Sequence, residues 1–108
     1  MGRQERRELE HCLGILIGHL LKWDYQPQKR SKSWRATIRK QRRAVEKLIH
    51  QSPSLQPYLP QAIAKAYESG KDSGGRDTPL NYSHFPEACP YKLEDVLDAK
   101  FLSNGRNL

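Results

Sequence analysis

LEHCLGILIGHLLKW, residues 9 to 23, decides the fold of this chain of 108 residues. Its apolar residues recur at steps of three and four, which is the period of an α-helix, and they extend over more than half of the helix circumference. A helix with so much apolar surface must be covered on several sides. Gly14 and Gly18 lie on one flank, and each costs about 1 kcal/mol in helix propensity, which the close approach of another backbone would offset.

Three further helices are predicted after this one, so the fold class is all-α. Ser31 or Ser33 can cap the second helix, and Pro60 suits the first turn of the third. Pro53, after Ser52, begins a short helical turn. The helices are expected at about residues 3–23, 34–51, 60–69 and 93–101.

The remaining segments are expected to be irregular parts of one domain, residues 1–108. The composition of residues 70–77, GKDSGGRD, predicts a flexible loop. Residues 78–91 contain three prolines and several aromatic residues, and are expected to drape over the helices as an extended tail. Residues 103–108 are expected to be frayed.

These elements provide less cover than the first helix needs. Either the tail wraps tightly around it, or a second copy or a partner chain completes the core. The second alternative predicts an interaction face on the first helix, formed by Leu9, Leu13, Leu16, Ile17 and Leu20.

The positive charge of the chain is concentrated around KRSKSWRATIRKQRR, residues 29–43, where eight of fifteen residues are Lys or Arg and none is acidic. The whole chain has a formal charge of +7. Such a segment favours polyanionic partners, such as nucleic acid or an acidic protein. The predicted binding residues on or just before the second helix are Arg35, Arg39, Arg43, Lys40, Lys47, Lys29, Arg30 and Lys32.

Two polar residues lie within or beside the apolar stripes. His19 could act as a general base or a pH-sensitive switch, but a buried histidine bonded to a carboxylate or carbonyl is the more common situation. Arg42 lies at the edge of the second helix's apolar stripe. It is interpreted as half of a structural ion pair with a buried acid such as Asp24, or with an acid supplied by helices missing from this chain.

No pattern for a cofactor, a metal or a catalytic centre is evident. Cys12 and Cys89 form no CxxC pair, and with His11 and His84 they match no zinc spacing. The first residues resemble no signal peptide, and no apolar run is long enough to span a membrane. We therefore predict a cytoplasmic protein with free thiols that requires no cofactor, and a non-enzymatic role is favoured over an enzymatic one.

From His19 onward the chain resembles an uncharacterised bacterial family known as domain of unknown function twenty-nine. The resemblance implies an all-helical fold and carries no established activity or catalytic residues. Members have further helices before the segment that begins here near Gly2, so we expect those helices to be missing, as in a fragment, a gene with a misplaced start or a subunit completed by another chain. The resembling segments are His19–Trp23, Gln26–Pro27, Ser33–Arg35, Ile38, Gln41–Arg42, Ser52–Leu55, Tyr67, Phe85–Pro86, Cys89–Pro90 and Leu93–Asp98.

Two functions of different classes are compatible with the sequence. The first is a non-catalytic module that binds nucleic acid or another polyanion through the basic side of the second helix. The alternative is an interaction or oligomerisation subunit whose first helix docks on another chain. An enzyme with a small buried site around His19 and Arg42 is a distant third.

Overall fold

The computed structural model describes residues 3–25, 28, 31–76, 89–97, 101–102 and 106–107. Within them the chain is all-α, as predicted, apart from one pair of very short strands. The elements are α1 (Arg3–Tyr25), α2 (Lys32–Gln51), the 3₁₀ helix η2 (Pro53–Tyr58), α3 (Leu59–Arg76), α4 (Leu93–Leu97), β1 (Phe101–Leu102) and β2 (Arg106–Asn107). The two strands are antiparallel, with Phe101 opposite Asn107.

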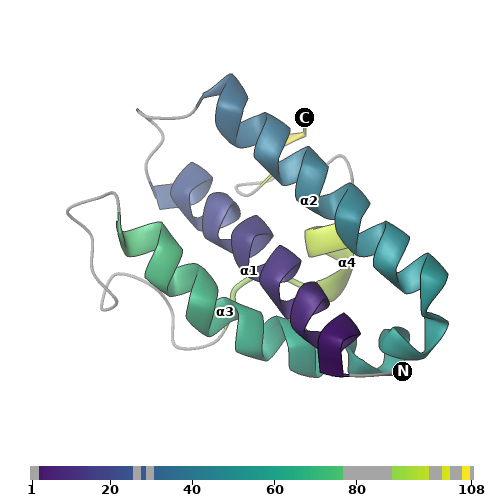
Figure 1. Ribbon diagram of the computed structural model, residues 1–108. Helices are drawn as coiled ribbons and strands as arrows, with labels where there is room; N and C mark the ends of the chain where they lie inside the picture. The colour runs from purple at the N-terminus through teal and green to yellow at the C-terminus, as the bar shows by residue number, and fades with distance from the viewer. Residues whose placement is uncertain are drawn as a thin grey trace.

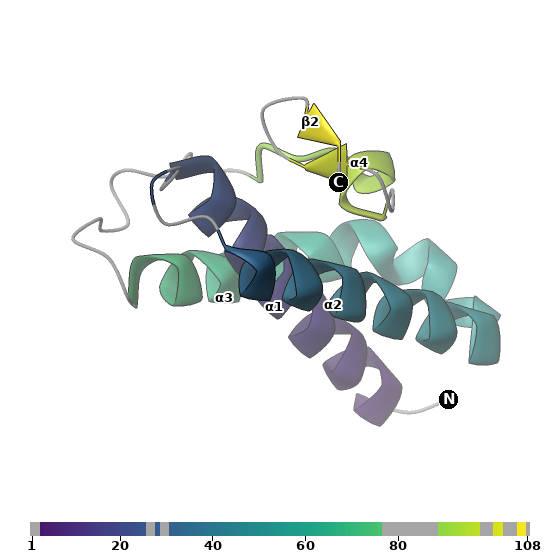
Figure 2. The same cartoon turned by 90° about the horizontal axis from the view of Figure 1, so that it is seen from above.

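Helix α1 is the centre of the molecule. Figure 1 shows it lying between α2 on one side and α3 on the other. Figure 2, seen from above, shows α4 and the strand pair together on one side of these three helices. Helix α1 is therefore covered from three directions by its own chain.

The core confirms that α1 is apolar around most of its circumference. The side chains of Leu9, Leu13, Leu16, Ile17, Leu20 and Leu21 are all 0% exposed. They pack in one cluster with Ile38 and Val45 of α2, with Ala62, Ala66 and Tyr67 of α3, and with Val96 of α4.

This burial corrects the predicted interaction face. Leu9, Leu13, Leu16, Ile17 and Leu20 cannot form an exposed docking surface, because α2, α3 and α4 already cover them. The expectation of a second chain over the first helix was based on a shortage of cover that the structure does not show. Sequence periodicity indicates how much of the surface of α1 is apolar. It does not indicate how much of that surface the short α4 and the long α3 can bury.

The two glycines of α1 allow α3 to approach closely, as their spacing predicted. The contact comes from a third glycine, Gly70 of α3. A Cβ atom on Gly70 would lie 3.1 Å from Cγ2 of Ile17, 3.2 Å from the backbone nitrogen of Gly18 and 3.4 Å from the carbonyl oxygen of Gly14. The backbones of α1 and α3 therefore meet here without side chains between them.

The start of α2 follows the predicted capping. Ser31 is the N-cap, and its hydroxyl accepts a hydrogen bond of 3.2 Å from the backbone N–H of Trp34. This satisfies one of the amide groups that have no partner within the first turn of a helix. At the other end, the N–H of Ser52 donates to the carbonyl of Leu48 at 2.8 Å, and η2 begins at Pro53 as expected.

The structure corrects three predictions about the part of the chain that follows α2. The prediction of a loop at 70–77 is wrong for residues 70–76, because α3 continues through Arg76. The contact of buried Gly70 with α1 outweighs the low helix propensity of the glycines in this segment. The last helix ends at Leu97, and residues 101–102 and 106–107 pair as strands, so the prediction of frayed ends is wrong for 106–107. Residues 77–88, including most of the predicted tail, lie outside the described residues.

The glycine contact predicts that Gly70→Ala destabilises the protein by roughly 1–3 kcal/mol, because the added methyl group would overpack against the backbone of α1. Urea unfolding followed by circular dichroism measures this change. Gly14→Ala is the matched control. Its Cβ would meet Ser69 Cβ at an ordinary 3.4 Å, and the gain in helix propensity is about 1 kcal/mol at most. Equal losses in both variants would contradict the close contact.

Candidate functional site

The outward side of α2 is a strongly basic surface. Ile38, Arg42 and Val45 are its buried residues, so the opposite side of this amphipathic helix faces solvent. We call this surface the α2 basic face. It consists of the exposed Lys32, Arg39, Lys40, Arg43 and Lys47, with the half-buried Arg35.

The predicted polyanion residues therefore come together where the structure describes them. Arg35, Arg39 and Arg43 follow one another at successive helical turns, as the spacing required. Glu46 is the one acidic residue within α2, near its end. Lys29 and Arg30 lie outside the described residues, so their placement beside this face stays a prediction.

A shallow hollow marks the N-terminal part of the α2 basic face. Lys32, Arg35 and Arg39 line it, and its volume is about 220 Å³. None of these three side chains forms an ion pair with another residue in the described part of the chain. The positive end of the helix dipole adds to their charge, because the hollow lies within the first turns of α2. The arrangement favours an anion over any other ligand.

Trp34 takes no part in this surface. It packs against the hydrophobic core, and the ammonium group of Lys22 lies 6.0 Å from the centre of its ring. Its side chain therefore lies on the core side of α2 rather than among the arginines. Among the described aromatic residues, none lies on the α2 basic face as a platform for stacked bases.

Arg42 differs from its neighbours because it is only 1% exposed. Its Nε donates to the carbonyl oxygen of Val96 at 2.8 Å, and one terminal nitrogen donates to that of Asp95 at 3.3 Å. The guanidinium thus binds the carbonyl groups of α4, where the helix dipole favours a cation. Its role is structural, as expected. The described partners are main-chain oxygens, and the ion pair expected with Asp24 or another acid stays a prediction.

His19 has the structural environment that is most common for a histidine within a core. Its Nδ1 donates to the carbonyl oxygen of Ile15, one turn earlier, at 2.9 Å. Because this bond leaves Nε2 as the acceptor in the neutral ring, the tautomer is fixed by the helix itself. The catalytic alternative for His19 and Arg42 gains no support from four hollows formed by the described residues, since neither side chain lines any of them.

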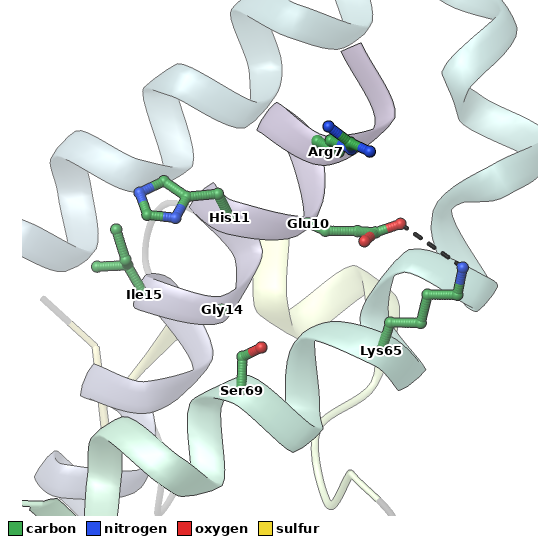
Figure 3. Close-up of a pocket in the computed structure, with 7 residues that line it drawn as sticks. All are labelled: Arg7, Glu10, His11, Gly14, Ile15, Lys65 and Ser69. Atoms are coloured by element: carbon green, nitrogen blue, oxygen red, sulfur yellow. Dashed lines mark ion pairs between the residues drawn. The ribbon is translucent and has the colours of Figure 1, made fainter. Parts of the chain in front are cut away.

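A second hollow lies between α1 and α3, and Figure 3 shows the side chains around it. Its volume is about 300 Å³. Arg7, Glu10, His11 and Ile15 come from α1, and Lys65 and Ser69 come from α3, on either side of Gly14. We call this the α1–α3 hollow. It combines cationic, hydroxyl and carboxylate groups within the reach of one small molecule.

The carboxylate in the α1–α3 hollow is already engaged. The hydroxyl of Tyr58 donates to Glu10, and the ammonium group of Lys65 lies 3.9 Å from the same carboxylate. Lys65 also donates to the Tyr58 hydroxyl at 3.3 Å. The guanidinium of Arg6 covers the other side of this cluster, 4.8 Å from the centre of the Tyr58 ring. The network joins α1, η2 and α3.

Sequence reasoning did not find the α1–α3 hollow. Its residues come from two segments that are fifty or more positions apart, and no motif connects them. The signal that could have pointed to it was the glycine spacing, since Gly14 lines the hollow beside a close helix contact. Without knowing which residues of α3 meet Gly14, no ligand set could be assembled.

The two cysteines are both half-buried and free. Burial raises the pKa of the Cys12 thiol, and the nearby Glu8 carboxylate raises it further. Burial also raises the pKa of the Cys89 thiol. Neither is therefore an activated nucleophile. Among the described residues no group of three or more His, Cys, Asp and Glu side chains could hold a metal ion, and His84 lies outside them.

Comparison with known proteins identifies a family and nothing more specific. The sequence matches the family described as "Domain of unknown function DUF29" over residues 1–102. The match begins before His19, so it is wider than the resemblance seen in the sequence. No curated protein matches, and no solved structure matches. Within the described residues, no helix has the length and apolar character needed to cross a membrane.

The contacts of Arg42 predict that Arg42→Met destabilises the protein by about 1.5–3 kcal/mol, because the α4 carbonyl groups lose charged hydrogen-bond donors. Arg43→Met is the matched control, since the neighbouring Arg43 is exposed and its loss should change stability by less than about 0.5 kcal/mol. Chemical unfolding of both variants gives the comparison. Similar small effects in both would exclude Arg42 as the tether of α4.

The raised thiol pKa values predict slow alkylation of the folded protein. Thiolate is the form that reacts with iodoacetamide. The pH at which labelling becomes fast should therefore be higher for the folded protein than for the protein unfolded in urea. The free energy of unfolding should correspondingly fall as the pH rises through the pKa of the unfolded thiols, because the unfolded chain then releases protons that the folded chain retains. Mass spectrometry of timed samples measures labelling at each cysteine. Equal rates with and without urea would contradict the burial.

Proposed function

This chain belongs to the family called Domain of unknown function DUF29, and we propose that it is a non-catalytic helical module that binds the phosphate backbone of nucleic acid through the α2 basic face. The observation that supports this most is the hollow formed by Lys32, Arg35 and Arg39, with no described acidic partner for any of them. A cytoplasmic location is part of the same proposal.

The distribution of charge within the chain distinguishes this face from an ordinary solvated surface. Residues 3–10 of α1 also face solvent in part, and they contain three arginines and three glutamates. The α2 basic face has six cations, and Glu46 is the only acid of its helix. Repulsion between like charges one turn apart is mildly destabilising. A surface that only had to be soluble would not need this uniform charge.

The length of the face also suits a phosphate backbone. From Lys32 to Lys47 the helix rises about 22 Å, and one strand of duplex DNA carries about six phosphates over that distance. The absence of a described aromatic platform favours contact with the backbone over stacking on single-stranded bases. Binding should therefore be salt-sensitive and indifferent to sequence.

We expect fluorescence anisotropy with labelled duplex DNA to show affinity that falls steeply with salt. The double variant Arg39→Glu/Arg43→Glu should weaken binding on the order of tenfold at low salt and reduce the log–log salt slope by about two. Both side chains are exposed, so the fold should be unaffected. Circular dichroism checks that it is.

The control is Arg7→Glu/Lys92→Glu, which changes the net charge equally at exposed sites on α1 and just before α4. It should bind nearly as well as the unchanged protein. Equal weakening by both double variants would show that only net charge matters. No binding of duplex DNA or single-stranded RNA, even at low salt, would show the proposal to be wrong and would leave an acidic protein as the partner of this face.

A further inference from the structure

We infer that the α1–α3 hollow is a second binding site, separate from the α2 basic face, for a small anion that carries phosphate or carboxylate groups. This inference does not depend on nucleic-acid binding. It rests on the size of the hollow, on the hydrogen-bond donors that line it and on the fact that its one carboxylate already has partners within the protein.

The hollow is large enough for a small molecule and too small for a polymer. Its volume of about 300 Å³ is at the lower end of the range for ligand pockets. Gly14 lines the hollow where α1 and α3 pack closely. A Cβ there would find only Ser69 Cβ at 3.4 Å and the carbonyl oxygen of Ala66 at 3.8 Å. The two helices are thus in van der Waals contact at this buried glycine, and the hollow opens beside that contact.

Donor groups dominate the lining. Arg7 and His11 lie on α1 one turn apart, and Ser69 lies on α3 across from them (Figure 3). Lys65 also lines the hollow, but Glu10 compensates its charge, so the net positive charge of the lining comes from Arg7. A guanidinium presents paired N–H groups that match the two oxygens of a carboxylate or a phosphate. The hydroxyl and imidazole groups can complete the hydrogen bonds.

The one acidic side chain of the lining does not reverse this preference. Glu10 extends toward Lys65, and its carboxylate accepts the hydrogen bond from Tyr58. Its charge is thus compensated within the protein. A cation entering the hollow would find no carboxylate without a partner, whereas an anion would find Arg7 and His11. The electrostatics therefore select an anion.

A nucleic-acid backbone would not use this site. Glu5 and Glu8 flank Arg7 along the helix, so a chain of phosphates following α1 would meet acidic side chains on either side. A compact anion held between two helices avoids them. This difference in charge pattern separates the α1–α3 hollow from the α2 basic face.

The test is a titration of ¹⁵N-labelled protein with inorganic phosphate, followed by amide chemical shifts at constant ionic strength. A parallel titration with citrate distinguishes phosphate from carboxylate ligands. We expect saturable shifts centred on Gly14 and Ser69 with at least one of the two anions. Arg7→Gln should weaken that binding at least fivefold, and Ser69→Ala about two- to threefold. Arg39→Gln, on the α2 basic face, should leave it unchanged.

Three results would overturn the inference. The first is shifts that grow linearly without saturation for both anions. The second is equal affinity in the unchanged protein and in Arg7→Gln. The third is saturable shifts that centre on α2 and disappear in Arg39→Gln. That last result would support the α2 basic face as the anion site. The inference about the α1–α3 hollow would then be wrong, while the proposed function would not be contradicted. The spectrum of each variant also shows whether it is folded.

Discussion

The burial of α1 is the constraint on which the rest of this structure depends. Six of its aliphatic side chains are completely buried, and each contributes about 1.5–3 kcal/mol relative to an exposed position. That gain requires cover on several sides from a short chain. The contact at Gly70 provides it on one side, because α3 can lie against the backbone of α1 without a side chain between them. Helices α2 and α4 then cover what remains.

The orientation of α2 is a consequence of the same constraint. Its apolar residues must face α1, which leaves its cations no direction except outward. Arg42 lies at the boundary between the two sides, and its long side chain lets it stay buried while its charge reaches the carbonyl groups of α4. One arginine of the basic segment thus holds the fold together, and its neighbours Arg39 and Arg43 remain available to a partner. Burial, not sequence position, separates the two roles.

The sequence was sufficient to predict the elements whose signals are local. The period of α1, the cap at Ser31 and the proline at the start of η2 each depend on neighbouring residues only. The length of α3 could not be predicted in this way, because its continuation past Ser69 depends on contact between Gly70 and a helix fifty residues away. The same limit applies to the sites. The α2 basic face comes from one helix and was predicted, while the α1–α3 hollow needs two helices in register and was not.

This difference in origin also separates the two proposed sites in physical behaviour. The cations of the α2 basic face are close together in the sequence, so an unfolded chain keeps much of their charge density and can still attract a polyanion. Ligands that also bind the unfolded chain stabilise the folded state less than their affinity suggests. The α1–α3 hollow exists only when Gly14 and Ser69 lie side by side. An anion that binds only there should therefore raise the unfolding temperature by the full amount that its concentration and dissociation constant predict, whereas tight binding of a polyanion to α2 can leave that temperature almost unchanged.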